Sequence, residues 1–126
     1  MCSLFSSRAL GAVSGVTVAV TPDTVLVGDR IHCTIGVRHS ANDVVSLEGI
    51  DSLSVQPFEL INRRQSSAVV SPGTRQERCD FELAVFTIGR QPVPRFTVVL
   101  RNNQGKLLTR EPYRPSSAVF VRALTD

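Results

Sequence analysis

The chain has 126 residues, the usual length of one domain, and its composition of 42% hydrophobic and 20% charged residues is typical of a globular fold. It contains no apolar run of about 18 residues, so the sequence predicts no membrane-spanning helix. It also has no Trp and only one Tyr, Tyr113, which argues against the aromatic platforms that bind most sugars and single-stranded nucleic acids.

The formal net charge of +3 is unevenly divided along the chain. Residues 1–56 hold three Arg and five acids, whereas residues 57–126 hold eleven bases and six acids. This asymmetry would suit an acidic partner or a lipid surface. The bases are spread over several expected strands and turns, however, and no nucleic-acid motif accompanies them, so we expect no nucleic-acid partner. The arginines of this half are Arg63, Arg64, Arg75, Arg78, Arg90, Arg95, Arg101, Arg110, Arg114 and Arg122.

The first 14 residues are rich in small side chains and show no periodicity. Ala9-Leu10-Gly11 has the small-x-small form of a signal-peptidase site, but Arg8 interrupts the apolar core that such a signal needs, and no basic segment precedes it. We therefore predict a flexible leader over residues 1–14 and a single β-sandwich domain over residues 15–126. A remnant of an export signal stays open as the alternative.

After the leader, short apolar segments separated by turn residues predict β-strands throughout. Pro, Gly, Asn and Asp mark the turns, as at Pro22-Asp23, Gly28-Asp29 and Pro72-Gly73. A serine-rich stretch, residues 66–74, is predicted to be a loop, and residues 87–90 to be a turn. The expected strands span residues 15–20, 24–27, 30–39, 43–49, 58–65, 74–86, 95–101, 106–111 and 117–124.

Strict alternation of apolar and polar side chains identifies the face of each strand that packs inward. Residues 80, 82 and 84 are expected on the opposite, solvent face. Seven to nine short strands with this pattern predict an all-β fold, an immunoglobulin-like antiparallel β-sandwich. The inward residues are Ile31, Cys33, Ile35, Val37, Cys79, Phe81, Leu83, Val85, Phe96, Val98 and Leu100.

Two of the three cysteines, Cys33 and Cys79, fall on expected core faces. If the strand of Cys79 pairs antiparallel with residues 30–38, Cys79 lies opposite Val37 and too far from Cys33 for a disulfide. We predict two buried thiols that behave as small hydrophobic side chains, with an inter-sheet disulfide as the alternative. Because Cys2 lies outside the expected core, the cysteines do not fix the redox compartment.

No arrangement typical of a metal or catalytic site is present. His32 and His39 are seven residues apart on one strand and its exit, so they face opposite sides, and neither has an obvious acid partner in the sequence. No serine lies in Gly-x-Ser-x-Gly, and Asp80 and Glu82 share an expected solvent face. We therefore predict that the protein is not an enzyme and has no catalytic, cofactor-binding or metal-binding residue. Four aspartates near loops lack the close spacing of calcium sites and are interpreted as turn residues: Asp23, Asp29, Asp43 and Asp51.

With no metal or catalytic motif in the sequence, the edges of the sandwich are the candidate binding surfaces. Exposed edge strands accept partner strands by strand addition. Prolines can also protect an edge from such pairing. The sequence leaves both interpretations open for Pro92, Pro94, Pro112 and Pro115.

Several motifs, taken in order, resemble a known family. They are Val27-Gly28-Asp29, then Pro57-Phe58-Glu59, then Phe86 with Gly89 and Pro94, and a closing strand at residues 116–124. Over residues 16–124 the chain resembles the extracytoplasmic β-sandwich of BatD-like proteins, the bacterial oxygen tolerance family. Each motif is weak alone, and their order and spacing carry the resemblance.

The resemblance implies a non-catalytic protein-interaction domain, the extracytoplasmic part of a membrane-anchored protein involved in envelope assembly or stress tolerance. The implied partners are envelope proteins or the products of neighbouring genes, among them MoxR-type ATPases and von Willebrand factor A-domain proteins. Membrane attachment would come from a segment absent from this chain, and a cytoplasmic location stays open, as for an immunoglobulin-like trafficking domain. The alternative function is a ligand-binding β-sandwich of the carbohydrate or adhesion type.

Overall fold

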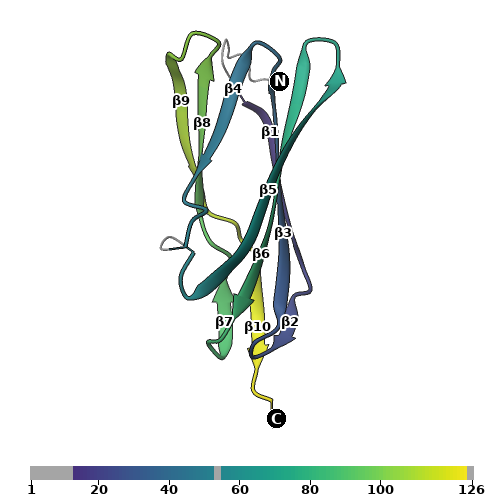
Figure 1. Cartoon of the computed structure of the whole chain (residues 1–126), viewed down its shortest axis with the longest axis vertical. Coiled ribbons are helices and arrows are strands. Elements are labelled where there is room, and N and C mark those ends of the chain that lie inside the picture. The colour runs from purple at the N-terminus through teal and green to yellow at the C-terminus, as the bar shows by residue number, and fades with distance from the viewer. Residues whose placement is uncertain (1–12, 53–54, 125–126) are drawn as a thin grey trace.

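The computed structural model describes residues 13–52 and 55–124, which form ten β-strands and no helix (Figure 1). The all-β prediction is confirmed, with slightly more strands than expected. The predicted leader lies almost entirely outside the described residues, although the first strand already begins at Val13. The strands are β1 (Val13–Thr21), β2 (Thr24–Leu26), β3 (Arg30–Ser40), β4 (Asp43–Glu48), β5 (Phe58–Ser71), β6 (Thr74–Val85), β7 (Gly89–Pro92), β8 (Phe96–Asn102), β9 (Leu107–Tyr113) and β10 (Ala118–Arg122).

The strands form three sheets, with the orders β1-β3-β6-β5, β2-β10-β7 and β4-β8-β9. Figure 1 shows β3, β5 and β6 running along the length of the molecule, with β4, β8 and β9 toward the upper end and β2, β7 and β10 toward the lower end. Buried side chains of all three sheets belong to one core, as expected of a β-sandwich. One pair departs from the antiparallel pattern, because β10 runs parallel to β2.

The core faces follow the predicted alternation. All the side chains expected to point inward from β3, β6 and β8 are buried, which confirms that part of the interpretation. One residue of the predicted solvent face differs: Ala84 is buried, because Arg30 of β3 and Glu59 of β5 lie opposite it on the two neighbouring strands.

Two loop predictions are wrong because strand pairing overrides local composition. Residues 66–71, predicted to begin a loop, continue β5 to Ser71 and pair with the start of β6. Only the Pro72-Gly73 turn remains from that loop, with Gly73 at a φ of 76°. The predicted turn at residues 87–90 lies at residues 86–88 instead, and Gly89 opens β7, which pairs with β10; its φ of 103° favours glycine at this position.

Candidate functional site

On the outer face of the four-stranded sheet, Asp80 of β6 is held by neighbouring side chains. Thr34 Oγ1 donates to Asp80 Oδ1 at 2.8 Å, and Arg78 Nε donates to Oδ2 at 3.0 Å. The Thr34 hydrogen bond is the main cause that lowers the pKa of the Asp80 carboxyl; burial opposes it, and Arg78 and Arg64 reinforce it. A carboxyl with a lowered pKa stays ionised at neutral pH, which is the opposite of what a glycosidase general acid requires.

The second carboxylate of this face, Glu82, also binds its neighbours. Asn62 Nδ2 donates to Glu82 Oε1 at 2.7 Å, and Oε2 lies 3.7 Å from Arg30 and 3.9 Å from His32. The sequence shows no obvious acid partner for His32, and the structure supplies Glu82 as that partner. Glu82 lies directly opposite His32 in the β3–β6 register, so an exact strand register would have revealed the pair.

On the inner face of the same two strands, His39 is buried in a polar cluster with Glu77 and Ser67. His39 Nε2 lies 2.9 Å from Glu77 Oε2, and Nδ1 lies 2.7 Å from the Ser40 carbonyl oxygen. Because a carbonyl oxygen only accepts, Nδ1 donates to Ser40, and Nε2 lies within hydrogen-bond distance of the Glu77 carboxylate. Ser67 Oγ donates to Glu77 at 2.7 Å and not to His39, so the cluster lacks the serine–histidine contact of a nucleophilic site. The two histidines face opposite sides of β3, as predicted.

The buried cysteines Cys33 and Cys79 are both free thiols, as predicted, and the disulfide alternative is wrong. The predicted register was displaced by two residues, because Cys79 lies opposite Ile35 and not opposite Val37. Burial raises the pKa of the Cys33 thiol to about 12. Burial also raises the pKa of Cys79, although the nearby guanidinium of Arg63 opposes that shift.

The predicted turn acids act locally where the structure shows their bonds. Asp29 Oδ2 accepts from the Leu26 amide at 3.0 Å, across the turn that follows β2. Within residues 13–52 and 55–124, no group of three or more His, Cys, Asp or Glu side chains could hold a metal ion. In the same residues, no helix is long and apolar enough to cross a membrane.

The longest edge strand among the described residues is β5. Six strands are sheet edges, namely β1, β2, β4, β5, β7 and β9, and at 14 residues β5 is the longest of them. Register shifts at Leu60/Asn62 and Val69/Ser71 bound a regular run, Asn62–Val69, in which every residue is exposed. We call Asn62–Val69 the open edge. Two other edges contain proline, Pro92 in β7 and Pro112 in β9, whereas β5 contains none.

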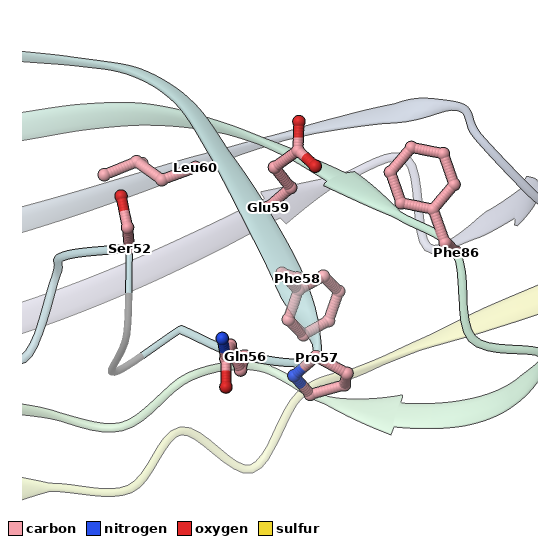
Figure 2. A pocket seen from close by; sticks show the side chains of 7 residues that line it. All are labelled: Ser52, Gln56, Pro57, Phe58, Glu59, Leu60 and Phe86. Carbon is pink, nitrogen blue, oxygen red and sulfur yellow. The ribbon is translucent and has the colours of Figure 1, made fainter.

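A hollow of about 580 Å³ adjoins the start of β5, and we call it the Phe86 pocket. Figure 2 shows the Phe86 ring at the end of β6, the rings of Pro57 and Phe58 at the start of β5, and the Glu59 carboxylate between Leu60 and Phe86. Phe86 is 56% exposed, which is unusual for so large an apolar ring. The hollow is lined by Ser52, Gln56, Pro57, Phe58, Glu59, Leu60 and Phe86.

Comparison with known proteins adds no family to this geometry. No family model matches the sequence, and no curated protein is similar enough to match it. The BatD-like resemblance therefore stays a prediction.

Proposed function

We propose that this domain is a non-catalytic protein-interaction module that binds an extended segment of a partner protein along the open edge of β5. The observation that carries the proposal is the length and exposure of this proline-free edge. Eight consecutive residues, Asn62–Val69, pair regularly with β6 on one side. On the other side the backbone N–H and C=O groups of alternate residues face away from β6, where a partner could add a fifth strand to the four-stranded sheet.

The second half of β5 favours an uncharged partner segment, whereas Arg63 and Arg64 give the start of the open edge a positive charge. From Gln65 to Ser71 the strand QSSAVVS has no charged residue, and Val69 and Val70 are exposed. Charged side chains are a common device that keeps edge strands from pairing, and this stretch lacks them. An extended partner segment rich in β-branched residues would pack against these small side chains.

The Phe86 pocket supplies a place for one apolar side chain of the partner. In strand addition, backbone hydrogen bonds provide affinity and pockets for side chains provide specificity. The pocket lies at the start of β5, where Phe58 and Leu60 precede the open edge. A partner strand that runs along Asn62–Val69 and continues past Asn62 toward Leu60 would approach the pocket that Phe86 lines.

The cellular setting of the proposal comes from the BatD-like resemblance alone. On that basis we propose that the domain works outside the cytoplasm, tethered to a membrane, with envelope proteins or operon neighbours as partners. The gene sequence beyond Asp126 tests the tether. A run of about 20 apolar residues within the next hundred or so codons would support it, and a longer reading frame without such a run would contradict it.

Selection from a display library of random linear peptides tests the interaction itself. Two proline variants, Gln65→Pro and Ser66→Pro, test the edge. In an edge strand the amides of two consecutive residues point to opposite sides, one into the sheet and one to the open side. The variant whose amide points to the open side should keep its melting temperature and bind selected peptides at least about tenfold more weakly.

The matched controls are Gln65→Thr and Ser66→Thr, which retain the amide and favour a strand. These variants should bind the selected peptides as the unmodified protein does. Unchanged peptide binding by both proline variants, with both folded, would contradict the proposal.

A further inference from the structure

A second hollow, of about 440 Å³, lies between the two proline-rich segments of the chain. Three arginines line it: Arg90 from β7, Arg95 from the connection to β8, and Arg114 from the segment that follows β9. The neutral polar side chains Ser116 and Ser117 also line the hollow, and no acidic residue does. We call this hollow the arginine pocket.

The three arginines of the pocket share one hollow, and within the described residues none of them lies in an ion pair. Elsewhere Arg30, Arg78 and Arg110 lie in ion pairs with Glu82, Asp80 and Glu48. Within the described parts of the chain, no ion pair involves an arginine of the pocket. Three like charges that share one hollow without a carboxylate raise the local positive potential and attract anions.

The walls of the arginine pocket are held in place. The Val93 amide donates to the Ser117 carbonyl oxygen at 3.2 Å, which joins the two proline-rich segments. Pro92, Pro94 and Pro115 line the pocket, and each has a φ restricted by its ring. Val93 is buried beneath them, so the base of the hollow belongs to the core. A site whose backbone is already fixed loses less conformational entropy when it binds a ligand.

We propose that the arginine pocket binds a small oxyanion with at least two negative charges, for which a phosphate group is the best chemical fit. Guanidinium groups recognise phosphate through paired hydrogen bonds, and serine hydroxyls donate to its remaining oxygens. The arginine pocket shares Gln56, Pro57 and Phe58 with the Phe86 pocket but includes no residue of the open edge, so variants of its arginines test this site separately from strand addition.

A titration of the ¹⁵N-labelled full chain with inorganic phosphate and with pyrophosphate, at constant ionic strength, tests the site. Saturable amide shifts are expected at Arg90, Arg95, Ser116 and Ser117, with tighter binding for pyrophosphate. Arg90→Gln and Arg114→Gln should each weaken binding by roughly tenfold, because each removes charge-assisted hydrogen bonds.

The matched control is Arg38→Gln, which removes an exposed arginine of β3 that lies outside the pocket. It should leave the affinity unchanged within about twofold. The proposal is overturned if neither anion gives saturable shifts, or if Arg38→Gln weakens binding as much as the pocket variants do.

A final arm distinguishes a free phosphate compound from a lipid headgroup. The protein is sedimented with phosphatidylcholine vesicles that either contain or lack phosphatidic acid. Pocket-dependent binding of soluble pyrophosphate alone assigns a free ligand, and pocket-dependent binding of the phosphatidic acid vesicles as well assigns a headgroup. Failure of both arms overturns the site.

Discussion

The edge strands β5 and β7 differ in whether their outer sides are open to pairing with another strand. β7 is four residues long and ends in Pro92, whose ring nitrogen has no hydrogen to donate. β5 is 14 residues long, contains no proline and leaves Asn62–Val69 exposed. Proline closes two of the six edge strands, β7 and β9, and among the four proline-free edges β1, β2, β4 and β5 it is the length of β5 that distinguishes it. The predictions below probe whether β5 is held firmly enough to serve as a template.

Thiol reactivity gives the largest expected effect, because Cys79 of β6 lies directly opposite Gln65 of the open edge. If β5 stays paired, Cys79 remains buried, and Cys33 is protected further by a pKa raised to about 12. In a Cys2→Ser background at pH 8, both thiols should react with Ellman's reagent at least about 100-fold more slowly than a free thiol.

When the protein is unfolded in guanidinium, both thiols should react rapidly with Ellman's reagent. Rapid reaction of one thiol in the folded protein would show that β5 separates from β6. It would contradict the claim that β5 is held firmly enough to pair with a partner strand.

The His39–Glu77 pair gives the next largest effect, because it fixes β6 to β3 beneath the open edge. Glu77→Gln should lower the free energy of unfolding by about 2–3 kcal/mol, since the buried His39 would lose the carboxylate that lies 2.9 Å from its Nε2. Urea denaturation monitored by circular dichroism measures the loss. Glu111→Gln, on the exposed face of β9, is the control and should change stability by less than about 0.5 kcal/mol. Equal losses of unfolding free energy in the two variants would contradict a stabilising contact between His39 and Glu77.

Gly89 tests the other edge. Gly89→Ala should destabilise the fold by about 1–3 kcal/mol through its positive φ alone, because a Cβ there would meet no other atom within 4 Å. Gly15→Ala is the matched control, since its Cβ is equally free and its φ is not positive, so thermal melting should change little. If Gly89→Ala had the same melting temperature as Gly15→Ala, the claim that the positive φ of Gly89 disfavours a side chain at the start of β7 would be refuted.

The smallest effect concerns Asp80, which lies opposite Arg64 of the open edge. Its lowered pKa means that the ionised carboxyl stabilises the fold above the unfolded value near 3.8, and that this contribution is lost as the pH falls through the folded pKa. Thr34→Val should remove less than about 1 kcal/mol at pH 6, because Asp80 is 38% exposed and solvent screens it.

The acid side of the stability profile should flatten correspondingly in Thr34→Val. A variant that lost the same free energy at pH 2 as at pH 6 would show that the hydroxyl acts on packing and not on the carboxylate.

The core of this fold was predictable from sequence because it follows a two-residue period. Phe81, Leu83 and Val85 were placed correctly by alternation alone. The second half of β5 was not, because Ser66 and Ser67 resemble turn residues and only their pairing with β6 makes them strand. Local composition cannot report a partner strand.

The candidate sites were less predictable because they depend on contacts distant in the sequence. The arginine pocket exists because Pro92 of β7 lies opposite Ala118 of β10, which brings residues 90–95 next to residues 114–117. The His39–Glu77 pair is a diagonal contact, because Glu77 lies opposite Val37 and His39 lies opposite Arg75, and neither alternation nor direct pairing of opposite residues predicts such a contact. An edge can be recognised as open only when the order of strands in the sheet is known.

Hydrogen exchange on the complex with a selected peptide tests the central claim most directly. Strand addition to β5 predicts that alternate amides of Asn62–Val69 exchange at least about tenfold more slowly in the complex, while those of β7 and β9 do not change. Protection confined to β1, β4 or a loop end, with the amides of Asn62–Val69 unaffected, would contradict it.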